Sequence, residues 1–128
     1  MAQYKILIID DEEDTLSLLK DVFETEGYEV NVARDGPESL EILKDFTPDI
    51  ILLDIMMPKM NGWVVFMNLQ KDERLRKIPV MVVSAKPLSK ESKDKVQLLG
   101  VKDYIIKPFD LSSLSEKVRS VIEKSENI

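Results

Sequence analysis

Residues 6–11 read ILIIDD, and residues 50–54 read IILLD. Each apolar run is short, rich in isoleucine and ends at aspartate, which is typical of a strand buried on both faces of a parallel sheet. The carboxyl ends of such strands line the ligand crevice of an open sheet. We therefore expect Asp10, Asp11 and Asp54 to meet at one sheet edge. Such a cluster calls for a cation or a proton, because like charges about 4 Å apart repel by roughly 4 kcal/mol at an effective dielectric near 20.

The composition narrows the class of protein. The 128 residues suit one domain with its own core, and the net charge of -6 argues against direct contact with nucleic acid or an anionic membrane surface. No signal peptide or membrane-spanning run is present, so we expect a soluble, cytoplasmic protein. The sequence has no cysteine and no histidine, which leaves carboxylates, hydroxyls and lysine for any chemistry.

Strand-like segments alternate with segments of helical period, which is the signature of βαβ units. The expected strands cover residues 5–9, 29–32, 50–53, 80–83 and 103–106. The helices between and after them are expected to bury one apolar stripe each, formed by Leu16, Leu19 and Phe23; by Leu40, Leu43 and Phe46, up to Pro48; by Val65 or Phe66 with Leu69; and by Leu111, Leu114, Val118 and Val121 or Ile122. Leu18 is expected to be exposed.

The fourth helical segment is less amphipathic than the others. Residues 89–95 are all polar, and Val96, Leu98 and Leu99 follow as the expected anchor. Because helices owe most of their stability to packing, we expect the first half of this helix to be held weakly.

Two further strand ends carry polar groups, Ser84 and Lys107-Pro108. Together with Asp10-Asp11 and Asp54, in this order, they make the chain similar to the receiver domain of two-component response regulators. Supporting motifs are LDIMMPKMNG at 53–62, ARDG at 33–36 and KPF at 107–109. The resemblance covers essentially the whole chain. It implies an α/β, flavodoxin-like fold with a five-stranded parallel sheet in the order 2-1-3-4-5 and helices on both faces, formed by one receiver domain over residues 1–128 without an output domain.

The resemblance also implies roles for individual residues. Asp54 would be the phosphoryl acceptor and nucleophile, while Lys107 and Ser84 would contact the phosphoryl oxygens. Ser84 and Tyr104 would form the switch, although an aromatic residue in a strand is more often simply packed. The Lys107-Pro108 peptide bond is expected to be cis.

A magnesium site is implied at the same place. Asp11, Asp54 and the backbone carbonyl of Met56 would ligate Mg²⁺ directly, and Asp10 would act through bound water. Oxygen ligands and retained waters are what Mg²⁺ prefers.

The implied partners are a sensor histidine kinase or a histidine phosphotransfer protein, which donates the phosphoryl group, and a downstream protein target. Leu18 and its helix are the expected kinase contact. We expect no direct contact with nucleic acid or membrane, and a monomer, with a phosphorylation-dependent dimer as the alternative. The chain would catalyse only its own phosphorylation and dephosphorylation, which would change the surface near the fourth helix, fifth strand and fifth helix.

Other interpretations stay open. Asp10 and Asp11 could cap a helix, Asp54 could be a turn residue, and Ser84 and Lys107 could be ordinary strand-end groups. The joint appearance of these residues at four strand ends favours function. A haloacid-dehalogenase-like phosphatase would need a second aspartate where Met56 stands. Turnover of an added phosphomonoester would favour that phosphatase. A receiver-like docking module that is never phosphorylated is the remaining rival, and labelling of Asp54 distinguishes it from a functional receiver domain.

Overall fold

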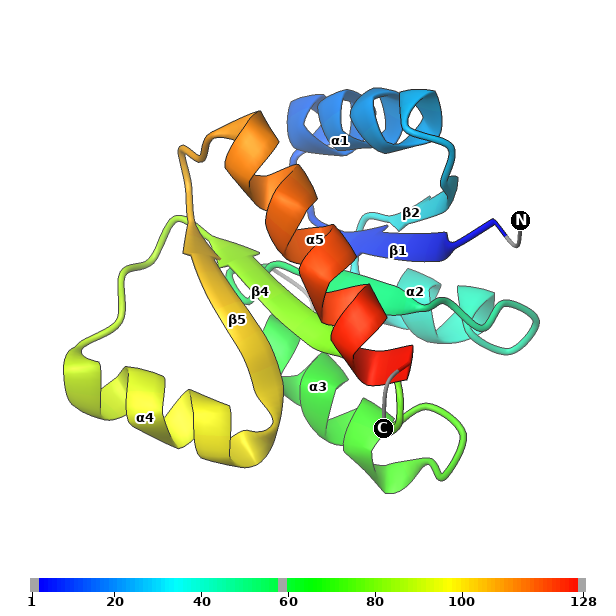
Figure 1. Cartoon of the computed structure of the whole chain (residues 1–128). Helices are drawn as coiled ribbons and strands as arrows, with labels where there is room; N and C mark the ends of the chain where they lie inside the picture. The colour runs from blue at the N-terminus through cyan, green and yellow to red at the C-terminus, as the bar shows by residue number, and fades with distance from the viewer. Residues whose placement is uncertain (1–2, 58–59, 127–128) are drawn as a thin grey trace.

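The structure is a computed structural model that describes residues 3–57 and 60–126. Five parallel strands form one sheet in the order β2-β1-β3-β4-β5, which confirms the expected fold class (Figure 1). The strands are β1 (Lys5–Ile9), β2 (Glu29–Ala33), β3 (Ile50–Leu53), β4 (Val80–Ser84) and β5 (Val101–Ile106). The helices are α1 (Glu13–Thr25), α2 (Gly36–Ile42), α3 (Gly62–Lys71), α4 (Lys90–Leu99) and α5 (Leu111–Glu126). Pro58 and Lys59, in the predicted loop before α3, lie outside the described residues.

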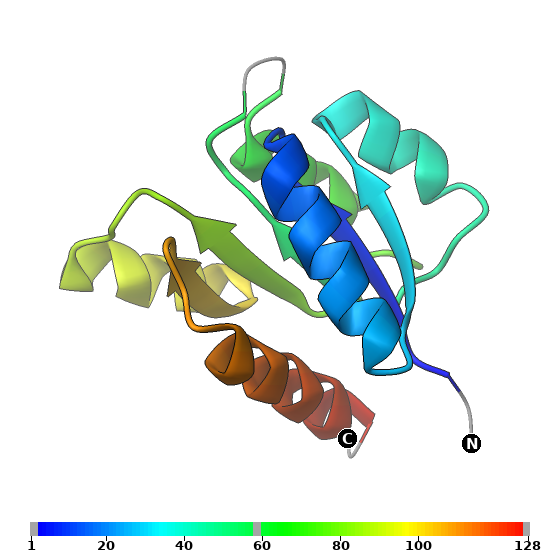
Figure 2. The same ribbon diagram turned by 90° about the horizontal axis from the view of Figure 1, so that it is seen from above.

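The central strands are buried on both faces because successive side chains enter two different cores. Leu7 and Ile9 of β1 pack in the core that also contains residues of α3 and α4, whereas Ile6 and Ile8 pack with residues of α1 and α5. Figure 2 shows α1 and α5 together on one side of the sheet. Ile9 lies opposite Leu53 in the register of β1 and β3, so the residues that follow these two strands are neighbours.

Helices α1 and α5 bury the predicted stripes. Leu16, Leu19 and Phe23 of α1 are buried, and Leu18 is 47% exposed, as expected. In α5 the residues Leu114, Val118 and Ile122 are buried, whereas Leu111 and Val121 are half-buried. Asp110 caps α5, since its Oδ1 accepts a hydrogen bond from the backbone N–H of Ser112 at 2.8 Å.

The second helix is shorter than the sequence predicts, because it ends at Ile42 rather than near Pro48. Leu43 and Phe46 are nevertheless buried, and Leu40 is half-buried. The guanidinium of Arg74 donates a hydrogen bond to the carbonyl of Leu43. That carbonyl is therefore satisfied without a continuing helix, and the apolar residues beyond it reach the core from turns.

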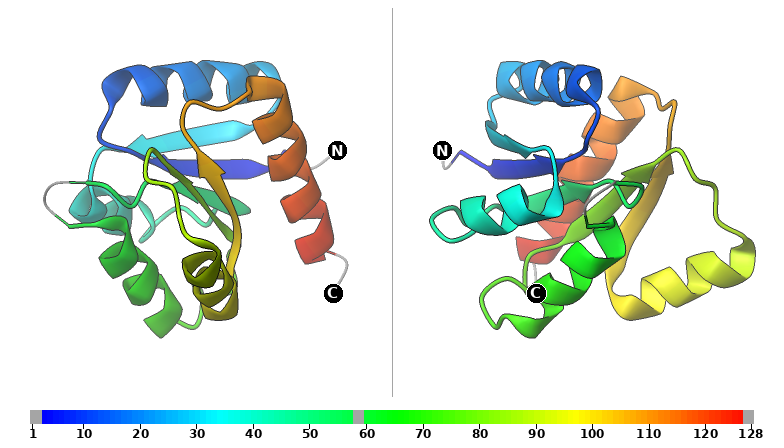
Figure 3. Two further views of the ribbon diagram at one scale, coloured as in Figure 1. Left: turned by 90° about the vertical axis from the view of Figure 1, so that its left-hand side faces the viewer. Right: turned by 180° about the vertical axis from the view of Figure 1, so that it is seen from behind.

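The anchor predicted for α4 is wrong in two of its three residues. Val96 is buried, but Leu98 is 88% exposed and Leu99 is 54% exposed. Figure 1 and the right-hand view of Figure 3 show α4 beside β5, the edge strand, at the periphery of the molecule. A helix at an edge contacts a single strand, so one apolar residue faces the core and the neighbouring leucines face outward. Weak packing therefore extends over more of α4 than the sequence suggests.

Candidate functional site

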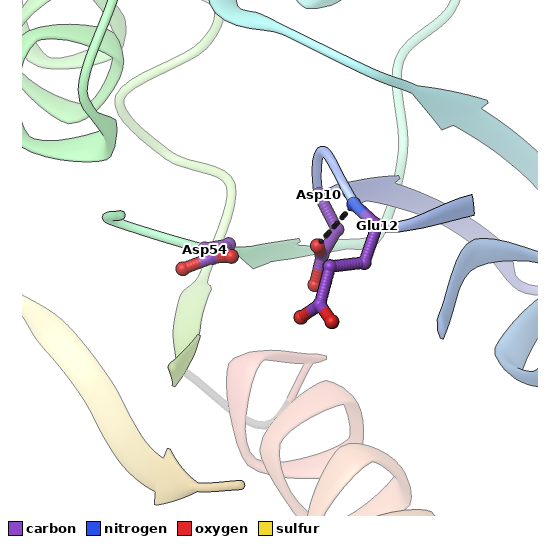
Figure 4. A group of neighbouring side chains, drawn as sticks. All are labelled: Asp10, Glu12 and Asp54. Carbon is purple, nitrogen blue, oxygen red and sulfur yellow. Dashed lines mark hydrogen bonds between the residues drawn. The ribbon is translucent and has the colours of Figure 1, made fainter. Parts of the chain in front are cut away.

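The predicted residues lie at the carboxyl ends of four strands. Asp10 follows β1 and Asp54 follows β3, and both side chains are buried (Figure 4). Ser84 ends β4 and is fully buried. Lys107 follows β5, and only 12% of its side chain is exposed. The parallel topology brings these groups to one edge of the sheet, although β1 and β5 are about as far apart in sequence as the chain allows.

Each buried aspartate divides its two oxygens between two tasks. Oδ1 of Asp10 accepts a hydrogen bond from the backbone N–H of Glu12, and Oδ1 of Asp54 accepts one from Met56, both at 2.9 Å. The other oxygen of each faces the ammonium of Lys107, at 2.7 Å from Asp10 and 3.5 Å from Asp54. The turn-residue interpretation of Asp54 therefore accounts for one of its oxygens only. The second oxygen of Asp54 faces the ammonium of Lys107.

Lys107 is shared among three carboxylates. Its Nζ also lies 2.7 Å from Oε1 of Glu12. Burial opposes the charge on Lys107, but hydrogen bonds to Asp10 and Glu12 outweigh burial, so the pKa of Lys107 is raised. The ammonium is thus fixed in its charged state at the centre of the cluster.

Burial disfavours the ionised form of Asp10. Burial raises the pKa of Asp10 from 3.8 to about 6, even though hydrogen bonds from Lys107 and Glu12 act in the opposite direction. Ionised Asp10 is therefore only partly compensated by Lys107. A second cation nearby would lower the free energy of the ionised form.

The carboxylates fit the magnesium ion that the resemblance to receiver domains implies. Oxygen atoms of Asp10, Glu12 and Asp54 lie within 4.8 Å of one another. Asp11 is exposed, and its carboxylate is not part of this group. Met56 follows Asp54 by two residues and its side chain is exposed. The direct ligation assigned to Asp11 and to the Met56 carbonyl stays a prediction.

Glu12 is the site residue that sequence reasoning missed. It stands among acidic residues at the start of a helix, where a carboxylate is explained by the helix dipole alone. Its contact with Lys107 joins residues 95 positions apart, and no local pattern signals it.

The predicted switch residues meet at the backbone of Lys86. The N–H of Lys86 points to Oγ of Ser84 at 3.4 Å, and the hydroxyl of Tyr104 donates to the carbonyl of Lys86 at 2.6 Å. Tyr104 is half-buried, and burial raises its pKa. Both residues therefore contact the segment that connects β4 to α4.

A groove of about 480 Å³ opens beside the cluster. Its lining includes the Lys107 side chain, Leu18 of α1, and Pro108 and Phe109 from the turn after β5. The Lys107-Pro108 peptide bond is cis, which confirms the prediction. The groove joins exposed apolar surface directly to the lysine of the cluster.

Comparison with known proteins identifies the family of the chain. The family model for the response regulator receiver domain matches residues 6–119. The chain is 36% identical over 126 residues to the DNA-binding dual master transcriptional regulator RpaA of Synechocystis, covering 97% of this chain and 51% of RpaA. The chain spans about half the length of the first curated relatives that it matches.

Solved structures share the architecture. A CheY-like response regulator receiver domain protein from Methanospirillum hungatei superposes with a TM-score of 0.88 at 28% identity, covering 98% of both chains. The response regulator TrrA of Thermotoga maritima, solved in complex with Mg(2+)-BeF, has a TM-score of 0.78 at 28% identity and covers 93% of this chain and 99% of its own. The chain belongs to the response regulator receiver domain family.

Proposed function

We propose that the chain is a phosphorylation-dependent signalling switch whose acceptor is Asp54. One observation carries this proposal: Asp54 is buried, with Oδ1 held by the backbone and Oδ2 directed at Lys107. Asp10 is also buried, but its second oxygen is engaged at 2.7 Å by Lys107. Asp54 is therefore the buried carboxylate with the more available oxygen.

In the proposed reaction, an oxygen of Asp54 attacks the phosphorus of a phosphohistidine on a partner protein. A bond between phosphorus and the Asp54 oxygen forms while the bond between phosphorus and the histidine nitrogen breaks, and the imidazole leaves after taking up a proton. Lys107 and Ser84 donate hydrogen bonds to the phosphoryl oxygens. Phosphoryl transfer depends mainly on positioning and charge stabilisation, so these few groups suffice. The chain acts on itself alone and not on other phosphorylated substrates.

Mg²⁺ is the proposed cofactor, held by Asp11, Asp54 and the Met56 carbonyl, with Asp10 acting through water. When bound, it supplies positive charge against the phosphoryl oxygens. The carboxylate group at the site and the Mg(2+)-BeF complex of TrrA support the assignment. Asp10, whose ionisation is disfavoured by burial, would gain the most from the added cation.

Phosphorylation is proposed to change the surface of α4, β5 and α5. Ser84 and Tyr104 both contact the backbone of Lys86, which leads into the weakly packed α4. Movement of the Ser84 hydroxyl toward the phosphoryl group removes its contact with the Lys86 N–H, and Tyr104 then turns inward. Both surface states are present beforehand, and the phosphoryl group shifts their populations.

The proposed donor is a sensor histidine kinase or a histidine phosphotransfer protein. The groove beside Lys107 supports this, because apolar side chains of Leu18 and Phe109 lie next to the acceptor cluster and could seat the donor. A downstream protein target would bind the α4-β5-α5 surface. We propose that the chain is a monomer, unless phosphorylation pairs two copies.

The receiver residues themselves are proposed to make no contact with nucleic acid, since the net charge of -6 disfavours it. RpaA is described as DNA-binding, but only about half of its length corresponds to this chain. In the part of the chain that the structure describes, no helix is both long enough and apolar enough to cross a membrane. We propose the cytoplasm as its location.

Phosphodonor labelling tests the proposal. The protein is incubated with acetyl phosphate, with and without Mg²⁺, and its intact mass is measured. We expect one added phosphoryl group, dependent on Mg²⁺, in the wild type and none in Asp54→Asn. Absence of labelling in the wild type would refute the proposal, and turnover of an added phosphomonoester would instead favour a phosphatase.

A further inference from the structure

Glu12 contacts Lys107, the lysine that is proposed to donate to the phosphoryl group. The ammonium of Lys107 has three N–H donors, and three carboxylates surround it. The two short contacts, both at 2.7 Å, go to Asp10 and Glu12, and the contact with Asp54 is the long one at 3.5 Å. Asp54, the proposed acceptor, therefore has the longest of the three contacts with Lys107.

The three carboxylates differ in their freedom to move. The side chains of Asp10 and Asp54 are 3% and 5% exposed, and each has its Oδ1 fixed by a backbone N–H. The side chain of Glu12 is 60% exposed, and among the described residues its carboxylate contacts only Lys107. Glu12 is therefore the partner that Lys107 can release without leaving a buried carboxylate unpaired, which would be costly.

A phosphoryl group on Asp54 adds acceptor oxygens that compete for the same three N–H donors. For Lys107 to donate fully to them, one of its short contacts has to lengthen. If Lys107 released Asp10, a buried carboxylate would be left without a cation in a region of low dielectric. If it released Glu12, an exposed carboxylate would be solvated by water instead.

We infer that Glu12 is a positioning residue that restrains Lys107 in its resting place and competes with the incoming phosphoryl group. Glu12 thereby slows phosphorylation of Asp54. This inference rests on the proposed role of Asp54 as the acceptor.

The test compares initial rates of Asp54 labelling by acetyl phosphate at a Mg²⁺ concentration that saturates each variant. Glu12→Gln keeps the length of the side chain and removes its charge. We expect labelling to be about threefold to fivefold faster, as suits the loss of one partly exposed ion pair. Asp14→Asn is the matched control: it removes a nearby exposed carboxylate of α1 that contacts no charged group among the described residues. Its rate should equal that of the wild type.

A Lys107→Met background shows whether the effect passes through the lysine. There, Glu12→Gln should leave the labelling rate unchanged, because no ammonium remains to be released. Equal acceleration by Asp14→Asn, or acceleration that persists without Lys107, would overturn the inference in favour of a general charge effect. An unchanged or slower rate in Glu12→Gln would overturn it as well.

A second readout does not depend on phosphorylation. In the unphosphorylated protein, the NMR signals of the Lys107 side-chain methylene next to Nζ should shift in Glu12→Gln and stay in place in Asp14→Asn. Absence of a shift would show that Glu12 does not hold the lysine in solution. If the wild type cannot be labelled at all, the proposed function fails, whereas the NMR result still reports on the contact.

Discussion

Gly62 lies directly against the backbone of Asp54, so that a Cβ at position 62 would overlap with the carbonyl oxygen of the aspartate. This contact seats the first turn of α3 on the strand end that carries the proposed acceptor. The φ angle of Gly62 is not in the left-handed region, so backbone conformation does not explain the glycine. The close approach of the Asp54 backbone does, because it leaves no room for a Cβ atom.

Gly62→Ala should therefore disturb the site as well as the fold. The added methyl pushes on backbone and not on a flexible side chain, so we expect a loss of about 1–3 kcal/mol in the free energy of unfolding and slower labelling of Asp54. Denaturant unfolding and intact-mass labelling measure the two effects. Val64→Ala, on the exposed face of the same helix, should change stability by less than about 0.5 kcal/mol. Equal behaviour of the two variants would contradict the contact.

Asp10→Asn should stabilise the protein at neutral pH. The pKa of Asp10 is about 6 in the folded protein against an ordinary 3.8, so the folded state binds this proton more tightly than the unfolded chain. The free energy of unfolding of the wild type then falls as pH rises between about 4 and 6. Asparagine removes the charge and can still accept the N–H of Glu12. We expect a gain of about 1–3 kcal/mol at pH 7.

The pH dependence separates this cause from others. The gain of Asp10→Asn over the wild type should shrink as pH falls through about 6 and vanish well below the ordinary pKa of 3.8, where Asp10 is protonated in both states. The exposed Asp45→Asn is the control and should change stability by less than about 0.5 kcal/mol. A gain that is independent of pH, or a loss at neutral pH, would contradict the assignment. Mg²⁺ should bind Asp10→Asn more weakly than the wild type.

Tyr104→Phe should loosen the segment between β4 and α4. The variant removes the hydrogen bond from the tyrosine hydroxyl to the Lys86 carbonyl, which contributes about 0.5–1.5 kcal/mol. Amide hydrogen exchange of residues 86–95 should become faster, while exchange in β1 and β3 stays unchanged. Tyr4→Phe removes another tyrosine hydrogen bond, to Glu126 at the surface, and should leave residues 86–95 unaffected. Unaltered exchange in Tyr104→Phe would contradict the link.

The two classes of apolar residue in α4 should respond differently to truncation. Val96→Ala removes buried atoms and should cost roughly 1–2 kcal/mol, whereas Leu98→Ala should cost less than about 0.5 kcal/mol because Leu98 is 88% exposed. Urea unfolding of both variants measures the difference. A larger cost for Leu98→Ala would mean that α4 packs through its leucines after all.

Features that depend on local interactions were predictable from the sequence, whereas features that depend on contacts between distant residues were not. The strands Lys5–Ile9 and Ile50–Leu53 were predictable because their apolar runs are local and are buried on both faces. The end of α2 was misplaced because the Leu43 carbonyl is satisfied by Arg74, which is 31 positions away. Leu98 and Leu99 were misplaced because counting leucines does not reveal that α4 lies on an edge strand.

For the candidate site, the positions of the residues at strand ends were predictable, but their side-chain contacts were not. Asp10, Asp54, Ser84 and Lys107 stand at strand ends, and parallel topology alone brings strand ends together. Which carboxylates contact the Lys107 ammonium, and how closely, depends on side-chain geometry. The contact between Glu12 and Lys107 could therefore not be predicted from the sequence. For the same reason the sequence could not show that Asp11 would be exposed while Asp10 is buried.

Of the four acidic residues at this edge of the sheet, Asp54 is the one that we propose to receive the phosphoryl group. The most direct measurement treats the labelled protein with borohydride, which reduces an acyl phosphate and leaves free carboxylates intact, and then locates the altered residue by peptide mass spectrometry. We expect a single altered position, Asp54. Alteration at Asp10, Asp11 or Glu12 in its place would contradict it.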